Sequence, residues 1–222
     1  MPKKDIMKGS EYCGYELAQR EQFYSKKNLD KGIALVNTMT ERHSKVLQTR
    51  LDLKYPTEIT SDGKNNDFQR TMESYMKELS RKGYDPQFIA KREQKVSKNP
   101  HYHVVIQVNG NKKRDRTSLI ESAERHWGHT LGLTQQEVHE KKLVYPCNSN
   151  TKNTPLPNGY MLDRNAKDFQ ETKACAIRQL SYLAKMDPED MTQSKARKFF
   201  SSQFLKDYEI AIEKKRKWLE QH

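Results

Sequence analysis

The sequence predicts an α+β fold in which a central antiparallel sheet of about five strands is covered by helices. Segments of period two alternate along the chain with segments of helical period. Two of the predicted strands are separated by only a short turn, which joins antiparallel strands but cannot join parallel ones. The order of strand, helix, two strands, helix, weak strands and helix is mixed, as in α+β layer structures. We expect extra helices at the N- and C-terminal ends.

The N-terminal segment is polar with scattered apolar positions. From about Glu16 to His43 it favours one or two modest helices, interrupted near Asn28 to Gly32. The first clear strand is VLQTRLDLKYP, which begins at Val46 and ends at Tyr55-Pro56. Apolar and small residues alternate in it with Gln48, Arg50, Asp52 and Lys54.

A helix and a hairpin are predicted next. Asp67 is a plausible helix cap, and Gly83 closes the helix. Residues 86–94 (PQFIAKREQ) form a second predicted strand, and HYHVVIQVNG forms a third that stops at Asn109-Gly110. The turn at Asn99-Pro100 favours a hairpin between these two strands.

The remaining elements complete the predicted order. We expect a helix over about 117–131, short strands near 143–145 and 160–162, a helix over about 168–186 and a basic helix over roughly 192–219. The sequence then divides into an N-terminal helical extension (1–45), a catalytic domain (46–188) and a basic C-terminal helix (189–222). Trp127 in HWGH is expected to be a core residue, and the two flanking histidines are not expected to form a second metal site.

The charge balance favours a polyanionic partner. Lys and Arg total 41 and Asp and Glu total 29, so the net charge is +12. No apolar run approaches the roughly 20 residues that span a bilayer, and the N-terminus has no secretory pattern. Three widely spaced cysteines favour reduced thiols over a disulfide framework or a zinc cluster. The absence of a GxxxxGK[ST] motif argues against a nucleotide cofactor. We therefore expect a cytoplasmic, nucleic-acid-binding protein.

The third strand contains a candidate metal site. Its period of two puts Tyr102 and the following apolar positions on one face, and His101 and His103 on the other. Two imidazoles on one side of a strand can converge on a divalent ion, and Glu93 on the neighbouring strand is a plausible third ligand. Such a site leaves coordination positions open and suits Mg²⁺ or Mn²⁺. Alternatively, the two histidines contact only water or a phosphate.

The helix over 168–186 contains a candidate nucleophile. Its apolar stripe faces the core, whereas Arg178, Tyr182 and Lys185 share the opposite arc. Neighbouring cations favour the phenolate and attract a phosphodiester. The alternative interpretation is an ordinary helix surface in a lysine-rich protein.

Together, a carboxylate, His101-Tyr102-His103 and a downstream Tyr182-x-x-Lys185 resemble the HUH endonuclease superfamily. Within that superfamily, these motifs resemble those of the gene-II-type replication initiators of filamentous phages and their prophage relatives. The segments that carry the resemblance cover about two thirds of the chain and are LQTRLDLKYP, KREQ, PHYHVVIQVNG, LPNGYMLD and RQLSYLAK.

The resemblance implies an RRM-like core and a metal-dependent tyrosine DNA endonuclease. His101 and His103 would bind the metal with Glu93 as third ligand. Tyr182 would attack the scissile phosphate to give a 5′-phosphotyrosine and a free 3′-hydroxyl primer, while Lys185 orients it or balances charge. The expected activity is site- and strand-specific nicking and joining that initiates rolling-circle replication at a single-stranded or supercoiled origin, with a host helicase and polymerase, in the cytoplasm of a bacterial host.

Rival interpretations remain open. Single-tyrosine HUH transposases share this motif order, and a non-catalytic basic nucleic-acid-binding protein would have the same charge. Conjugative relaxases place the tyrosine ahead of the histidines and usually add a third histidine, which the stretch between His43 and His101 lacks. If the protein binds DNA, the residues expected to contact phosphates are Arg92, Arg178, Lys195, Arg197 and Lys198.

Overall fold

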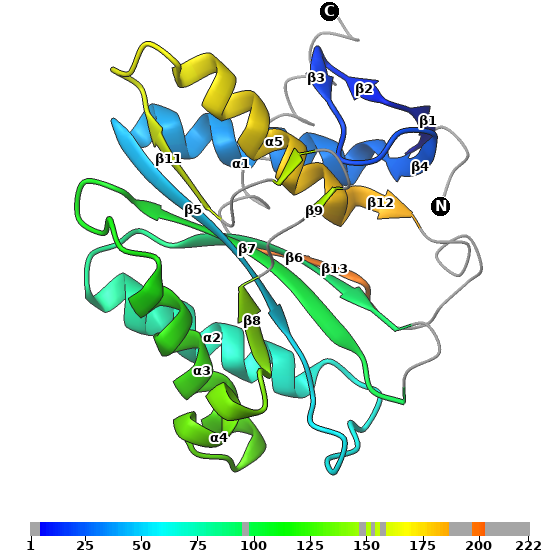
Figure 1. Cartoon of the computed structure of the whole chain (residues 1–222), viewed down its shortest axis with the longest axis vertical. Coiled ribbons are helices and arrows are strands. Elements are labelled where there is room, and N and C mark those ends of the chain that lie inside the picture. The colour runs from blue at the N-terminus through cyan, green and yellow to red at the C-terminus, as the bar shows by residue number, and fades with distance from the viewer. Residues whose placement is uncertain are drawn as a thin grey trace, which may run out of the picture.

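A six-stranded antiparallel sheet separates two layers of helices (Figure 1). The computed structural model describes residues 5–94, 98–146, 150–151, 154–155, 159–186 and 197–202. The sheet has the order β11-β5-β7-β6-β13, and β8 pairs with β5 beyond the end of β11. Its strands are β5 (Lys45–Leu53), β6 (Gln87–Glu93), β7 (His101–Asn109), β8 (Val144–Pro146), β11 (Gly159–Asp163) and β13 (Phe199–Ser201).

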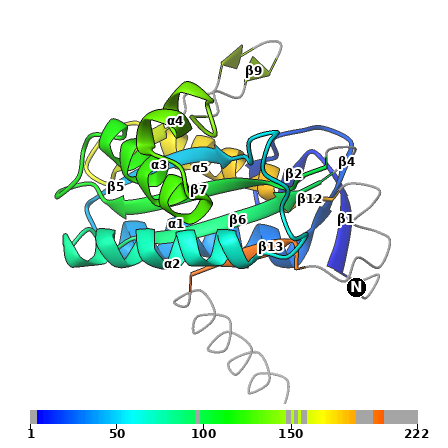
Figure 2. The same ribbon diagram turned by 90° about the horizontal axis from the view of Figure 1, so that it is seen from below.

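The helices cover both faces of this sheet. One face packs on α2 (Asn66–Arg81) and α3 (Thr117–Leu131), which α4 (Gln135–Glu140) extends. The other face packs on α1 (Lys26–Arg42) and α5 (Phe169–Ala184). The short hairpin of β9 (Asn150–Thr151) and β10 (Thr154–Pro155) stands out from these layers in Figure 2. The predicted α+β class with a central antiparallel sheet is confirmed.

The two faces differ in the side chains that they bury. Toward α2 and α3 the strands contribute an apolar core in which Trp127 is fully buried, packs edge-on against Tyr55 and donates its indole N–H to the Lys54 carbonyl at 2.7 Å. Toward α1 and α5 the same strands contribute polar residues, among them Gln48 and Gln107 with no exposed surface. Buried polar side chains need partners, so this second face must contain a hydrogen-bond network.

The N-terminal region differs from the prediction. Residues 16–25 do not form a helix: residues 17–21 connect two short strands through turns and bends, and α1 then runs without a break through Asn28 and Gly32. The Ser25 hydroxyl caps α1 by accepting from the Asn28 N–H, and Gly32 lies buried against Leu180 of α5. The short strands are β1 (Ile6–Gly9), β2 (Glu11–Tyr12), β3 (Tyr15–Glu16) and β4 (Gln22–Ser25).

The C-terminal prediction is also corrected in part. Helix α5 ends at Ala184, and Lys185–Met186 form β12, which pairs with β4. The sequence predicts a helix at Phe199–Ser201, but these residues form β13. They are extended because they pair with β6 and complete the open edge of the sheet. Residues 197, 198 and 202 are not helical either, whereas the remaining parts of the predicted helix, 192–196 and 203–219, lie outside the described residues, as does Cys147. Helix α4 was not predicted, since its six residues are too few to show a helical period.

Candidate metal centre

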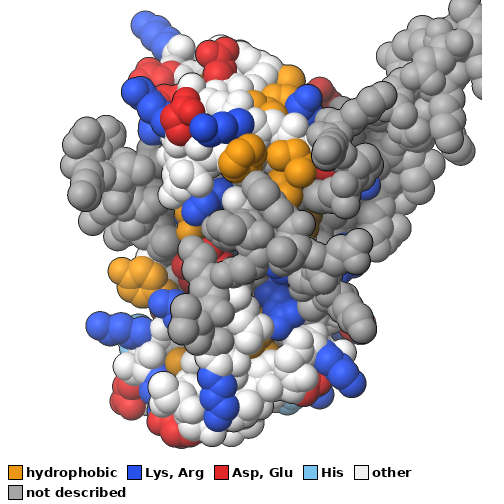
Figure 3. Space-filling model, turned by 90° about the vertical axis from the view of Figure 1, so that its right-hand side faces the viewer, with side chains coloured by type: hydrophobic (Ala, Val, Ile, Leu, Met, Phe, Trp, Pro, Cys, Tyr) orange, Lys and Arg blue, Asp and Glu red, His pale blue; other side chains and the backbone are white. Residues whose placement is uncertain are grey.

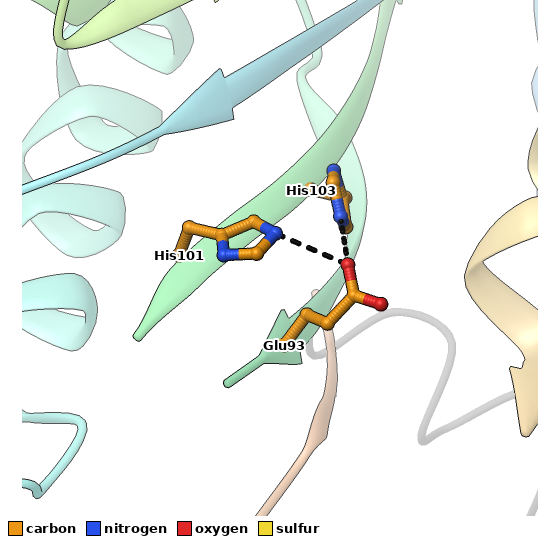
Figure 4. A group of neighbouring side chains, drawn as sticks. All are labelled: Glu93, His101 and His103. Atoms are coloured by element: carbon orange, nitrogen blue, oxygen red, sulfur yellow. Dashed lines mark hydrogen bonds and ion pairs between the residues drawn. The ribbon is translucent and has the colours of Figure 1, made fainter. Parts of the chain in front are cut away.

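Three side chains of the β6–β7 hairpin meet above one face of the sheet (Figure 4). Glu93 pairs with His101 across the hairpin, and His103 lies two residues farther along β7 on the same face. One carboxylate oxygen of Glu93 lies 3.1 Å from His101 Nε2 and 2.8 Å from His103 Nε2. The hairpin predicted from the Asn-Pro turn therefore brings the three expected ligands together.

The donor set fits a divalent metal ion. The ligand atoms of Glu93, His101 and His103 all lie within 4.8 Å of one another. Two imidazoles and one carboxylate occupy three positions and leave the others for water or substrate. The His101 side chain is 28% exposed, whereas those of Glu93 and His103 are 10% and 6% exposed. Of the three side chains, that of His101 is therefore the most accessible to solvent.

A second carboxylate orients His103. Asp52, which pairs with His103 across β5 and β7, accepts a hydrogen bond from His103 Nδ1 at 2.7 Å. With the proton held at Nδ1, Nε2 is the nitrogen available to a metal, an arrangement common around metal-binding histidines. The hydrogen bond between Asp52 and His103 therefore supports the fit to a metal, in addition to the three ligands themselves.

Charges around the site stabilise a histidine cation when no metal is bound. Burial by itself lowers the pKa of His103, but hydrogen bonds with Asp52 and Glu93 outweigh it and raise that pKa above its ordinary value. Hydrogen bonds with both imidazoles hold the pKa of Glu93 far below its ordinary range. Burial raises the pKa of Asp52, yet the hydrogen bond and charge of His103 bring it below the ordinary value. Both carboxylates are therefore ionised and ready to balance a cation.

Arg50 links the metal centre to Tyr182. Its side chain is 3% exposed, its Nε lies 3.7 Å from Asp52 Oδ1, and its guanidinium carbon lies 4.4 Å from the centre of the Tyr182 ring. A terminal nitrogen of Arg50 lies 3.2 Å from His103 Nδ1. Because that Nδ1 donates to Asp52, we take the carboxylate as the partner of Arg50.

Tyr182 lies beside the metal centre, on the same side of the sheet. Its ring meets the His103 ring edge-on, with the ring centres 5.3 Å apart, and Lys185 Nζ lies 5.9 Å from its centre. Buried glutamines hold α5 in this position: Gln107 donates to Gln48, which donates to Gln179 and to the Ala176 carbonyl. Since Gln179 precedes Tyr182 by three residues, the two share a helix face, so the polar network places the phenol over the sheet.

The expected phosphate contacts lie in different environments. Arg92 is only 6% exposed and alternates with Glu93 along β6, so it projects from the sheet face opposite the triad, and its contact with DNA stays a prediction. Arg178 is partly buried, with a terminal nitrogen 3.6 Å from Glu16. Arg197 is exposed and lies over the Phe200 ring, and the Lys198 carbonyl accepts from the Arg92 N–H. Lys195 lies outside the described residues.

Surface charge alone does not locate a nucleic-acid path. Figure 3 shows lysine and arginine side chains spread over one side of the molecule, with carboxylates among them. In the part of the chain that the structure describes, no helix is both long and apolar enough to pass through a membrane.

Arg50 and Asp52 are the site residues that sequence reasoning missed. They stand on the polar side of the alternating strand, two residues apart, and the hydropathy pattern assigned them only to the face opposite the apolar residues. The sequence carries no signal for their burial, because Gln48 and Lys54 continue the same polar side, and a solvated strand face would show the same alternation.

The chain belongs to the YagK/YfjJ C-terminal domain family, whose pattern it matches over residues 7–202. No curated protein matches it in sequence. Among solved structures it has a distant similarity to the N-terminal nuclease domain of non-structural protein 1 from minute virus of mice. The identity is 10%, the coverage is 78% of this chain and 77% of that one, and the TM-score is 0.29. A similarity at that level carries no argument about activity.

Proposed function

We propose that the chain is a metal-dependent, site- and strand-specific DNA nicking and joining endonuclease that initiates rolling-circle replication. The observation that carries the proposal is the position of Tyr182, whose ring lies 5.3 Å from the ring of His103 on the face that bears Glu93 and His101. The motif resemblance described above and the net charge of +12 support the same activity.

In this proposal each residue has a defined task. Glu93, His101 and His103 would hold Mg²⁺ or Mn²⁺, which when bound polarises a phosphate oxygen. The phenolate oxygen of Tyr182 attacks the phosphorus in line, and the bond from phosphorus to the 3′ oxygen breaks. The departing 3′ oxygen takes a proton from water and becomes the primer end. One phosphoester replaces another, so the reverse reaction rejoins the ends without ATP.

Arg50 and Lys185 assist Tyr182 in different ways. The buried Arg50 guanidinium stacks on the ring and limits its rotation, while its charge favours the phenolate. The Lys185 ammonium lies near the edge of the site and would neutralise charge on the phosphate. The Lys91 ammonium donates to the Lys185 carbonyl at 2.7 Å, which anchors the backbone where α5 ends.

The test uses covalent capture, which does not require a known origin. The full chain is incubated with Mn²⁺ and 3′-labelled single-stranded oligonucleotides of randomised sequence, and labelled protein is sought on a denaturing gel. Wild-type protein should retain the 3′ segment through a 5′-phosphate, and digestion should identify the Tyr182 peptide. The Tyr182→Phe variant should lose the adduct but keep its DNA affinity within about twofold. The matched control is Tyr84→Phe, because Tyr84 packs against the core on the opposite face.

The rival functions predict different outcomes. A non-catalytic binder would shift the DNA without any adduct from wild-type protein, and this result would end the nuclease proposal. Capture of the 5′ segment would reverse the proposed polarity. Sequencing of the captured oligonucleotides separates a replication origin from hairpin-flanked transposon ends. Nicking of supercoiled plasmid that carries the recovered sequence then tests initiation, and the involvement of a host helicase and polymerase stays a prediction.

A further inference from the structure

Tyr145 is an exposed aromatic residue on the sheet that carries the metal centre. It is 41% exposed, and among the described residues only Phe23 is a comparably exposed large hydrophobic side chain. Tyrosine is enriched at binding surfaces, because its ring offers an apolar face while its hydroxyl stays in contact with water. Tyr145 lies in β8, the short strand that pairs with the end of β5.

The register puts Tyr145 in line with the metal ligands. Asp52 pairs with Tyr145 on one side and with His103 on the other, so the three residues form one row across β8, β5 and β7. Directly paired residues project from the same face of a sheet. Paired Cα atoms lie about 5 Å apart, so Tyr145 stands about 10 Å from His103 along this row. Because the backbone repeat is at least about 3.4 Å, that separation spans at most about three nucleotides of single-stranded DNA.

A lysine accompanies the ring. Lys54 Nζ lies 5.8 Å from the centre of the Tyr145 ring, and the Lys54 side chain is exposed. Both backbone polar groups of Lys54 are hydrogen-bonded: its N–H donates to the Leu143 carbonyl at 2.8 Å, and its carbonyl accepts from the Trp127 indole N–H. A π-face and an adjacent ammonium on rigid backbone match the two parts of a nucleotide, because bases stack on aromatic rings and phosphates pair with cations.

We propose that Tyr145 and Lys54 form a nucleobase-binding subsite for single-stranded DNA next to the metal centre. Tyr145 stacks on a base within about three nucleotides of the phosphate held beside Tyr182, and Lys54 contacts the phosphate of that nucleotide. The subsite rests on the proposed function for its substrate, and it adds a contact that positions the strand before cleavage. Stacking tolerates any base, so this contact contributes affinity and register without reading sequence.

The test measures binding in the Tyr182→Phe background, where no adduct forms. Fluorescence anisotropy gives the dissociation constant for a labelled oligothymidine and for an abasic oligonucleotide of equal length and charge. Loss of one stacked base corresponds to about a 5- to 150-fold weaker complex. Tyr145→Ala should therefore weaken oligothymidine binding by that factor and leave abasic binding within about twofold. Tyr145→Phe, which keeps the ring, should bind oligothymidine like the parent.

Two further variants make the result specific. Lys54→Gln should weaken binding of both oligonucleotides alike and reduce the salt dependence by about one phosphate contact. Phe23→Ala is the matched control, because Phe23 is 42% exposed and has a lysine, Lys8, 6.0 Å from its ring, yet belongs to the separate β1-β4-β12 sheet. It should change neither affinity.

The outcomes separate the subsite from the nuclease proposal. Equal oligothymidine affinities for Tyr145→Ala and Tyr145→Phe would overturn the subsite even if wild-type protein forms the Tyr182 adduct. A Tyr145→Ala defect that is as large with the abasic oligonucleotide would also overturn it, since stacking needs a base. Absence of the adduct with a base-dependent Tyr145 effect would instead retain the subsite and reject the nuclease.

Discussion

Replacing Asp52 tests whether the outer carboxylate tunes the metal centre. The contact between Asp52 Oδ1 and His103 Nδ1 is 2.7 Å long, and the two side chains are 8% and 6% exposed, so water hardly screens it. Loss of such an outer partner lowers metal affinity by about 10- to 100-fold, or about 1.4 to 2.7 kcal/mol. Asp52→Asn keeps an oxygen that can accept from Nδ1, so its loss of metal affinity should be about 10-fold. Asp52→Ala has no such acceptor, and its loss should be about 100-fold.

The assay is calorimetric titration of the metal-free variants with Mn²⁺ at constant pH. Asp163→Asn is the control, because Asp163 also sits on this sheet but pairs with Lys45 at 2.8 Å, away from the triad. Removing the Asp52 charge also leaves the buried Arg50 uncompensated, which costs about 3 to 5 kcal/mol of unfolding free energy. Titrations therefore need a circular-dichroism check for folded protein. If folded Asp52→Ala binds Mn²⁺ as tightly as Asp163→Asn does, the proposed orientation of His103 is refuted.

Three other predictions concern pH, Arg50 and the core. In EDTA, the raised pKa of His103 means that its contribution to stability is complete below its unfolded pKa, about 6.5, and is lost as pH rises through the folded value. The urea midpoint of wild-type protein should thus fall more between pH 6 and pH 8 than that of His103→Asn, and equal slopes would contradict this. Arg50→Met should slow adduct formation by roughly 30-fold, which is equivalent to losing about 2 kcal/mol of stacking on Tyr182. Arg50→Lys should restore only part of the rate, because lysine lacks the planar group. The DNA affinity of both variants, measured by anisotropy, should stay unchanged. Trp127→Ala should lower the unfolding free energy by about 3 to 5 kcal/mol in urea titrations, and a loss under 1 kcal/mol would mean that the α3 side of the core repacks.

Patterns within short stretches of chain predicted much of the fold. The alternation from Val46 to Lys54, the hairpin that ends at Asn109 and the helix over 117–131 all agree with the structure. The errors fall where local pattern is weak or where distant contacts decide. Strands of two to four residues before α1 are too short to show a period, and β13 forms a strand because it meets β6. The family to which the chain belongs was not anticipated, and membership in the HUH superfamily remains a prediction.

The metal ligands depend on local information, whereas the rest of the site does not. Glu93, His101 and His103 belong to one hairpin, and a hairpin's register follows from its turn and its alternation, so the sequence by itself determined that they converge. Whether Tyr182 meets them depends on how α5, some eighty residues later, packs on the sheet. The glutamine network and the helices on both faces determine the position of Tyr182. The same packing makes Arg50 and Asp52 buried partners of the site and not solvated charges. Only the tertiary structure could do so, because the polar side of a strand looks alike in sequence whether water or a helix covers it.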